Sequence, residues 1–188
     1  MGKIEIESGV FLPMPVVLVG ADVDGRPNFM AAGWVSRVDF DPALVAVSLT
    51  KGRHTAKGIV HNGGFSLCFP SRDLVQKTDY CGLVSGKDTD KSGVFEVTYG
   101  KLPGVPLAAE CPLCVECRLI QTVTLDGSDI FIGEMVAAYA DEDQLSQGAP
   151  DAKKMNLFFL TMPDNKYWCL GDEVADAYSV GKGLIAQG

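Results

Sequence analysis

The chain reads as short apolar strands separated by turn signals, beginning close to its N-terminus. Pro15 to Asp24 contains the run Val16-Val17-Leu18-Val19, which predicts a strand. Asp24-Gly25 predicts a hairpin turn into a partner strand over Asn28 to Val38. Leu44 to Leu49 is apolar almost throughout, which favours a strand with cover on both faces.

Two short helices are expected after these strands. Residues 55–61 place Ala56, Ile59 and Val60 at helical spacing, and Asn62-Gly63-Gly64 predicts the stop. A strand over 65–69 follows, and Ser71 is a good N-cap for a second helix that closes near Gly82. The stripe expected to face the core in this helix is formed by Leu74, Val75, Thr78 and Cys81.

The second half of the chain again favours strands. Two long ones, Cys117 to Leu125 and Ile130 to Ala140, are expected to pair around Asp126-Gly127-Ser128. A last pair is expected around Pro163-Asp164-Asn165, before a short helix after Asp172. Many short strands with few helices indicate a closed antiparallel barrel. We find no repeat and no linker, so residues 1–188 are predicted to form one domain.

Composition narrows the classes of function. The 188 residues are 47% hydrophobic and 21% charged, which describes a globular protein. The formal charge of −8 argues against nucleic-acid binding, which normally uses a basic face. Charges alternate with apolar residues at the start and interrupt every long apolar run, so we expect a cytoplasmic protein without membrane insertion.

The six cysteines raise the question of a metal site. Cys111, Cys114 and Cys117 have spacing that resembles part of an iron–sulfur ligand run. No fourth ligand is near, and Cys117 begins an apolar, strand-like stretch, so we expect buried reduced thiols and no metal. His54 and His61 are the only histidines, which excludes a site built on several imidazoles.

The strongest candidate chemistry lies in Gly52-Arg53-His54-Thr55, where a helix is expected to begin. Free N–H groups at a helix start favour an anion, and Arg53 adds charge-assisted hydrogen bonds. This pattern suits a phosphate. The alternative is a capping Thr55 beside a solvated Arg53.

A second candidate is the run from Asn28 to Trp34. Asn28 offers a donor and an acceptor, and Trp34 offers a flat apolar surface. Ala31, Ala32 and Gly33 between them allow a ring to approach the backbone. The alternative is a turn Asn28 that leads a strand whose Trp34 packs in the core.

These two runs, an Asn followed by small residues and Trp and then Arg-x-Thr, resemble the flavin reductase-like family of FMN-binding split barrels, and within it the flavoredoxins. The resemblance implies FMN as cofactor, with Arg53, Thr55 and Lys91 on the phosphate and His54 as its neighbour. It also implies ring contacts from Asn28 and Trp34. The remaining positions expected to line the ring are Ala31, Ala32, Gly33, Ser48 and Leu49.

Two features qualify these site residues. Lys91 ends a loop whose Ser85-Gly86 and Asp90-Lys91 match the family element, with a solvated loop lysine as the alternative. Relatives often carry a His near the strand that begins at Ile130, where this chain has Ser128-Asp129. One cofactor contact of the family therefore has no counterpart here.

The resemblance implies an FMN-dependent oxidoreductase that takes electrons from NAD(P)H or a protein donor and passes them to a flavin, ferric iron or a protein acceptor. The alternative is an FMN-binding electron carrier without its own NAD(P)H turnover. No Gly-x-Gly-x-x-Gly element follows a strand, so any NAD(P)H is expected to stack on an open flavin face. The resemblance also implies a homodimer.

Overall fold

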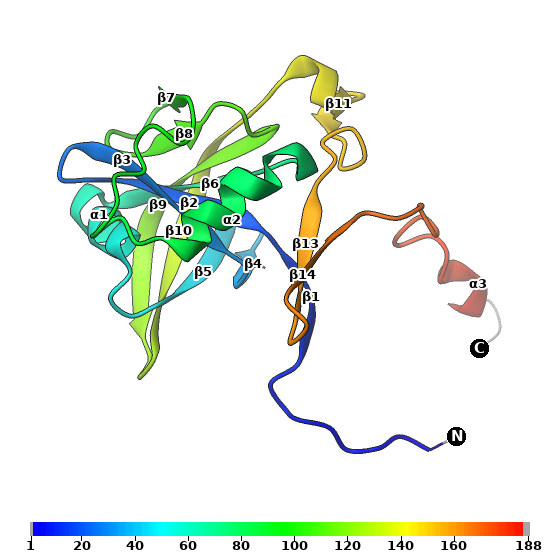
Figure 1. Ribbon diagram of the computed structural model, residues 1–188. Helices are drawn as coiled ribbons and strands as arrows, with labels where there is room; N and C mark the ends of the chain where they lie inside the picture. Colours follow the sequence, from blue (N-terminus) through cyan, green and yellow to red (C-terminus); the bar gives the residue numbers. More distant parts are fainter. Residues whose placement is uncertain (1, 186–188) are drawn as a thin grey trace.

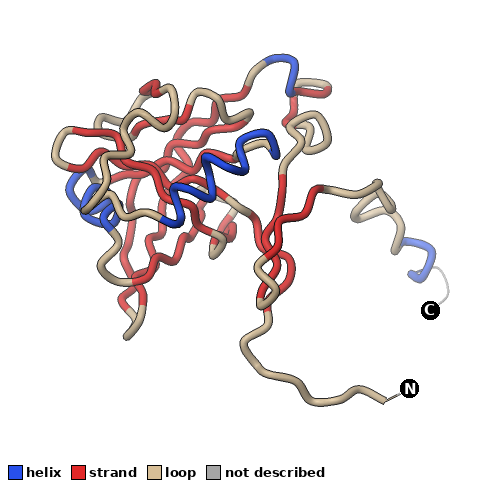
Figure 2. The backbone as a smooth tube through the Cα atoms, viewed as in Figure 1, coloured by secondary structure: helices blue, strands red, loops and turns tan. Residues whose placement is uncertain are grey.

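The computed structural model describes residues 2–185, and its centre is one antiparallel sheet of seven strands (Figures 1 and 2). The strands lie in the order β3-β2-β6-β9-β10-β5-β4. Their bounds are β2 Val17–Val23, β3 Arg26–Ala32, β4 Val35–Asp39, β5 Leu44–Thr50, β6 Gly64–Phe69, β9 Leu113–Thr124 and β10 Ser128–Ala140.

The two edge strands of this sheet, β3 and β4, are joined by Gly33 and Trp34 alone. In a flat sheet they would lie about 29 Å apart, at about 4.8 Å per strand. Two linking residues span at most about 11 Å. The sheet must therefore roll up until its edges meet, and it forms a barrel that is split between β3 and β4. The backbone N–H of Ser48 donates to Trp34 O (2.9 Å) and holds the linker on β5.

This corner corrects one prediction. The run from Asn28 to Val38 is not one strand, because β3 pairs with β2 and β4 pairs with β5. The other barrel strands are confirmed, with β9 beginning at Leu113 rather than Cys117. The predicted mainly β barrel with few short helices is correct.

The main core fills the barrel. Along β5 the side chains of Val45, Val47 and Leu49 are buried inside it, whereas Ala46 and Ser48 on the outer face are only half-buried. The expected cover on both faces of this strand is therefore wrong. A second core lies against β2 and β6 outside the barrel, under the helix α2. Its buried members are Leu18, Phe29, Cys68, Cys81, Phe95, Leu107, Ala108, Cys111 and Cys114.

The helix α1 (His54–Asn62) lies on β2 and ends at Gly63, whose φ of 66° places it in the left-handed conformation. Gly58 allows the close contact, because a Cβ there would collide with Asp22 O. Ile59 is buried, but Val60 is 61% exposed and is not part of the buried face. Its helical spacing with Ala56 and Ile59 therefore does not place Val60 against the core.

The helix α2 (Val75–Leu83) follows one turn of 3₁₀-helix, η1 (Arg72–Leu74). Ser71 precedes η1 but makes no side-chain capping bond, so its expected capping role is not seen. Thr78 and Cys81 are buried, as the stripe predicts.

A second sheet stands beside the barrel and consists of β1 (Phe11–Pro15), β13 (Phe158–Met162) and β14 (Lys166–Cys169) in the order β1-β13-β14 (Figure 1). The β13–β14 hairpin was predicted, but its pairing with β1 was not. Short elements complete the chain: β7 Val97–Tyr99, β8 Pro106–Ala108, η2 Glu142–Gln144, β11 Leu145–Ser146 and β12 Ala149–Pro150.

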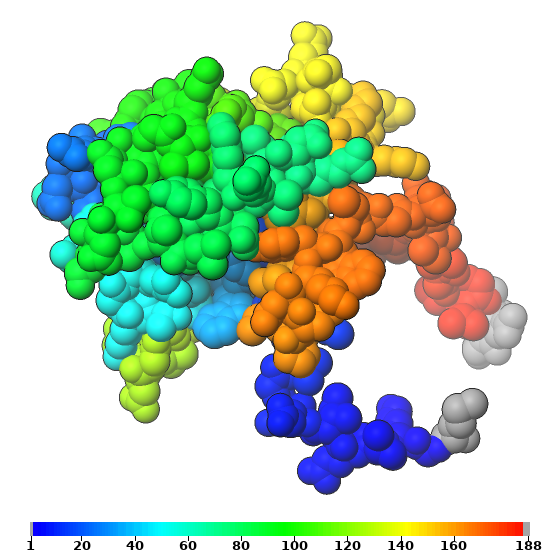
Figure 3. Space-filling model, in the orientation of Figure 1, coloured from blue at the N-terminus to red at the C-terminus, as the bar shows by residue number. Residues whose placement is uncertain are grey.

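Both ends of the chain leave the body (Figure 3). The last described element, α3 (Lys182–Ile185), is a four-residue helix that begins ten residues later than the expected start after Asp172. Among residues 2–185 no helix combines the length and the apolar composition that crossing a bilayer takes.

Candidate functional site

A buried hydrogen bond joins the two sequence motifs. Asn28 Nδ2 on β3 donates to Thr55 Oγ1 on α1 across 2.7 Å, and the two residues are 5% and 1% exposed. A buried amide and hydroxyl need such partners, so the bond fixes the helix start against β3. Within the described chain, it leaves the Thr55 hydroxyl proton and the Asn28 carbonyl oxygen without a protein partner.

The start of α1 is prepared for an anion. Arg53 is the N-cap residue, has extended backbone and makes no side-chain capping bond, and the first turn holds no acidic residue. The first-turn N–H groups and the helix dipole therefore present positive charge that no acidic residue of the first turn neutralises. The Arg53 side chain is exposed and forms no ion pair or side-chain hydrogen bond within residues 2–185. Thr55 does not cap the helix, so the capping alternative is wrong.

The charged groups around His54 are also mostly positive. Burial lowers the pKa of His54, and the neighbouring ammonium of Lys57 lowers it further, with smaller contributions from Lys91 and Lys87. Only Asp24 opposes them. The Nδ1 atom of His54 is buried and has no hydrogen-bond partner in the described structure. In a chain of net charge −8, this local excess of cations marks a place for an anion.

Lys91 is held more tightly than the sequence suggested. It is buried, and Nζ donates to Cys81 O (3.2 Å) and Val84 O (3.3 Å) at the end of α2. A cation there is stabilised by the helix dipole. Burial lowers the pKa of Lys91, and the charge of Arg53 adds to that lowering. Two of three ammonium hydrogens are thus used inside the protein, and the role of Lys91 in holding a phosphate stays a prediction.

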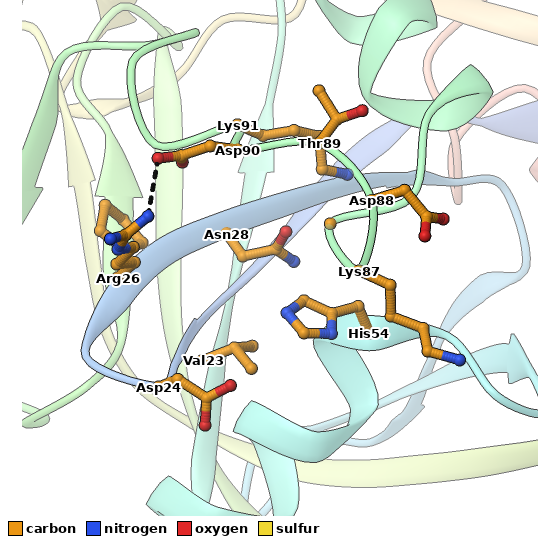
Figure 4. A pocket seen from close by; sticks show the side chains of 12 residues that line it. Val23, Asp24, Arg26, Asn28, His54, Lys87, Asp88, Thr89, Asp90 and Lys91 are labelled. Carbon is orange, nitrogen blue, oxygen red and sulfur yellow. Dashed lines mark hydrogen bonds and ion pairs between the residues drawn. The ribbon is translucent and has the colours of Figure 1, made fainter.

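A polar pocket of about 460 Å³ opens between the β2–β3 hairpin and residues 86–91 (Figure 4). Asn28 and His54 line it from β3 and α1, and Arg26 is tied to Asp90 across 3.1 Å at its rim. Gly86 lies against the site residues, because a Cβ there would collide with Asn28 Oδ1 and lie 2.8 Å from His54 Cδ2. The sequence analysis noted Gly86 only as part of the loop.

A smaller hollow of about 150 Å³ lies beside the split of the barrel, where residues of β3 and β5 come together. The structure brings seven of the predicted residues to it: Ala31, Ala32, Gly33, Trp34, Ser48, Leu49 and Arg53. Arg53 therefore borders both this hollow and the start of α1. Trp34 is 54% exposed, so the alternative of a core Trp is wrong.

Sequence reasoning missed several residues that line the hollow. Met14 and Leu160 come from the second sheet and form a wall of the hollow, together with Met30, Thr50 and Met162. Nothing in the local sequence marks residues so far apart as neighbours. Ser128 and Asp129, where the resemblance implies a His in relatives, pair with Thr50 and Leu49 and so lie at the strand ends beside the hollow.

The cysteine run does not converge on one point. Cys117 faces the barrel core, whereas Cys111 and Cys114 belong to the second core. Burial raises the pKa of Cys117 to about 12, and it also raises the pKa of Cys68, which pairs with Cys114 across β6 and β9. Protonated, buried thiols are poor ligands and poor nucleophiles. Residues 2–185 contain no cluster of His, Cys, Asp or Glu arranged to hold a metal.

Together these features describe a split antiparallel barrel with an anion-ready helix start beside a hollow lined by small and apolar residues. A profile of the flavin reductase like domain matches residues 9–160. The chain belongs to the flavin reductase-like domain family, as its sequence motifs indicate.

Similar proteins support the fold in detail. The chain is 50% identical to flavoredoxin from Methanosarcina acetivorans, whose structure superimposes with a TM-score of 0.96 over 98% of this chain and 100% of that one. Flavoredoxin from Desulfovibrio vulgaris (Miyazaki F) is 34% identical, with a TM-score of 0.88 over 96% and 100%. The uncharacterized protein YddH of Escherichia coli K12 is 36% identical over 140 residues, or 71% of this chain and 74% of that protein.

Proposed function

We propose that the chain is an FMN-dependent oxidoreductase that takes electrons from NAD(P)H or a protein donor and passes them to a flavin, ferric iron or a protein acceptor. Membership of the flavin reductase-like family and the likeness to flavoredoxins support this assignment. We further propose one cytoplasmic domain that works as a homodimer.

The observation that carries the proposal is the continuity of the site. The Asn28–Thr55 hydrogen bond locks the polar end together, and Arg53 extends from that end to the hollow at Trp34. A ligand with an anionic group at one end and a flat ring at the other would therefore meet suitable partners at both ends. FMN has this form.

The residues fit the two ends of FMN. At the phosphate end, Arg53 and the Thr55 hydroxyl would donate to the anion, with His54 beside it and Lys91 raising the local positive charge. At the ring end, the backbone of Ala31 to Gly33 would lie along the ring with Ser48 and Leu49. Asn28, predicted as a ring contact, lies at the polar end, where it holds Thr55. The bound cofactor supplies hydride and electron transfer.

This chain would also shield one side of the flavin ring from water and leave the other side accessible. Trp34 would cover one side of the ring with apolar surface and exclude water there. The other side of the ring would stay accessible, so that a reduced nicotinamide or a protein partner can approach it. The chain needs no side chain as acid or base for that transfer, and we assign no catalytic residue.

Anaerobic turnover tests the proposal. Purified protein loaded with FMN is mixed with NADH or NADPH, and the flavin absorption is followed. We expect the band to bleach and to return when free flavin or a ferric chelate is added. A band that bleaches with dithionite but with neither nucleotide would contradict the reductase assignment.

An electron carrier without its own NAD(P)H turnover is the second candidate, and the likeness to two flavoredoxins favours keeping it. Its donor would be a protein. The charge of −8 would steer a basic partner toward it, so the rate of reduction should fall as salt rises. A reaction rate independent of ionic strength would contradict that steering.

A further inference from the structure

A cavity of about 260 Å³ lies between the short strands β7 and β8, the start of β9 and the end of β10. It shares no lining residue with the two pockets of the candidate site. Thr98 and Asp141 in its lining are exposed, whereas Cys111 and Cys114 in the same lining are 5% and 4% exposed. The cavity therefore leads from the surface to two thiols that the proposed function does not use.

The two thiols lie against each other. Two residues separate Cys111 from Cys114, which is the spacing of dithiol redox pairs. The carbonyl oxygen of Ala108 accepts hydrogen bonds from the backbone N–H of Cys111 (3.0 Å) and from Sγ of Cys114 (3.3 Å). The chain thus turns over 108–111 and brings Cys111 back to Cys114 at one carbonyl group.

The contact makes the two thiols unequal. The hydrogen bond with Cys111 raises the pKa of Cys114, and the negative charge of an ionised Cys111 raises it further. Of the two, Cys111 is therefore the first to become a thiolate, which is the nucleophilic form of a cysteine. Cys114 keeps its proton until Cys111 has reacted.

The other buried thiols near this pair are not accessible. Cys68 is the register partner of Cys114 on β6, and its Sγ accepts from the backbone N–H of Ala108 (3.4 Å). Cys68 and Cys117 are fully buried and do not line the cavity. A bond between Cys111 and Cys114 would leave Ala108 O its N–H donor from Cys111, so no buried carbonyl would lose its last partner.

The size and charge of the cavity indicate what can reach the thiols. Its volume lies below the range of about 300–1,000 Å³ that is usual for drug-sized ligands, so it suits a smaller molecule. No Lys, Arg or His lines it, and Asp141 places a carboxylate there. In a chain of net charge −8, this lining favours a cation over an anion.

We propose that Cys111 and Cys114 form a dithiol site that reduces small disulfides with cationic ends and is itself oxidised to an intramolecular disulfide. The Cys111 thiolate attacks one sulfur of the small disulfide, whose S–S bond breaks, and one small thiol leaves with the proton that Cys111 gave up. The Cys114 sulfur then attacks Cys111 Sγ in the mixed disulfide, and its proton leaves with the second small thiol. Two protein thiols and one small disulfide thus become one protein disulfide and two small thiols.

Mass spectrometry of the flavin-free, full-length protein tests the site independently of FMN. Cys169→Ser is the starting variant, because Cys169 is exposed and would react by itself. Cystamine, a small disulfide with an ammonium group at each end, is the probe. It should remove two hydrogen atoms from the protein and leave no adduct. Peptide mapping should find a bond between Cys111 and Cys114 that dithiothreitol reverses.

Single variants separate the roles of the two thiols. Cys114→Ser keeps a hydroxyl for Ala108 O, and it should stop the reaction at a mixed disulfide on Cys111. Cys111→Ser should slow the reaction by at least about tenfold, because the thiolate that attacks first is gone. Cys117→Ala removes a buried thiol outside the cavity and should leave the reaction unchanged. Circular dichroism checks that each variant folds.

The charge of the probe tests the preference for cations. Measured against their rates with free cysteine, cystamine should react at least about tenfold faster than the anionic glutathione disulfide, and the ratio should shrink as salt rises. Asp141→Asn should lower the ratio, whereas Asp143→Asn, an exposed acid outside the lining, should not. Equal relative rates for the two disulfides would contradict the preference.

Three results would overturn the dithiol site itself. The first is a protein that keeps all its thiol hydrogens in excess cystamine. The second is a bond mapped to Cys68 and Cys114 in place of the proposed pair. The third is a folded Cys111→Ser variant that reacts as fast as the starting variant.

Discussion

The two ends of the candidate site are built differently. The polar end is buried and hydrogen-bonded, since Asn28 and Thr55 hold each other and Lys91 is fixed by carbonyls of α2. The ring end is open, with Trp34 54% exposed and walls drawn from both sheets. The comparison suggests that affinity and selectivity for a phosphate reside in the rigid end, whereas access for electron donors and acceptors resides in the open one.

The broadest effect is expected from a side chain at Gly86, because it should lower cofactor affinity and stability together. Gly86→Ala places a Cβ against Asn28 Oδ1 and His54, so the amide must move and the Asn28–Thr55 bond is disturbed. Overpacking of this kind costs about 1–3 kcal/mol, and we expect FMN affinity and the free energy of unfolding to fall together. Gly93→Ala, where a Cβ meets nothing within 4 Å, is the control. If the two variants behave alike in calorimetry and thermal melts, the close contact of Gly86 with Asn28 and His54 does not matter for cofactor binding or stability.

Arg53→Ala should weaken binding at the phosphate end of the site and leave binding at the ring end unchanged. Loss of a charge-assisted contact to phosphate costs about 1.5–3 kcal/mol, so FMN should bind about 10- to 150-fold more weakly. Riboflavin affinity and stability should stay unchanged, since the Arg53 side chain is exposed and forms no ion pair within residues 2–185. Lys51→Ala removes a nearby exposed cation as the control. If FMN and riboflavin lose affinity equally, Arg53 does not contact the phosphate.

Trp34→Ala probes the open end. A stacked aromatic contributes about 0.5–1.5 kcal/mol beyond its buried area, so fluorescence titration should show several-fold weaker binding of FMN and of riboflavin alike. Trp34→Phe should recover most of the affinity. Because the side chain is half-exposed, the unfolding midpoint should hardly change. A loss confined to FMN would place Trp34 at the phosphate instead.

The smallest effect concerns pH. Burial and Lys57 lower the pKa of His54, so its imidazole should titrate below the ordinary 6.5, as NMR of a His61→Gln variant with one remaining His can show. The unfolded chain binds this proton more readily, so stability should fall as the pH falls below 6.5. A phosphate nearby favours the protonated form, so FMN should raise the midpoint and bind more tightly at lower pH. If FMN leaves the titration midpoint of His54 unchanged, His54 does not lie beside the phosphate.

Sequence reasoning worked where the signal is local. Asp24-Gly25 and Asp126-Gly127-Ser128 set their hairpins, and the positive φ of Gly63 ends α1 where a glycine was expected to do so. Arg53 and Thr55 lie at a helix start as predicted. The part of the polar end formed by Arg53 to Thr55 consists of such neighbouring residues, and it was therefore visible in the sequence. The bond from Asn28 to Thr55 was not, because the two residues are far apart in the chain.

A closed barrel was predicted, but the place where the chain turns from one edge of the sheet to the other was not. The corner at Gly33-Trp34 carries the chain from one edge of the sheet to the other, and no local pattern distinguishes that from one continuous strand. Met14 and Leu160 meet the hollow only because β1 pairs with β13. Val60 shows the same limit, since helical spacing alone did not say where α1 meets β2.

The central claim is that the polar end selects a phosphate attached to a flavin. Titration of the flavin-free parent protein with FMN and, separately, with riboflavin tests it most directly. We predict one FMN bound per chain, with an affinity about 10- to 150-fold above that of riboflavin, the value of one charge-assisted contact. Equal affinities for the two ligands, or no binding of either, would contradict the account.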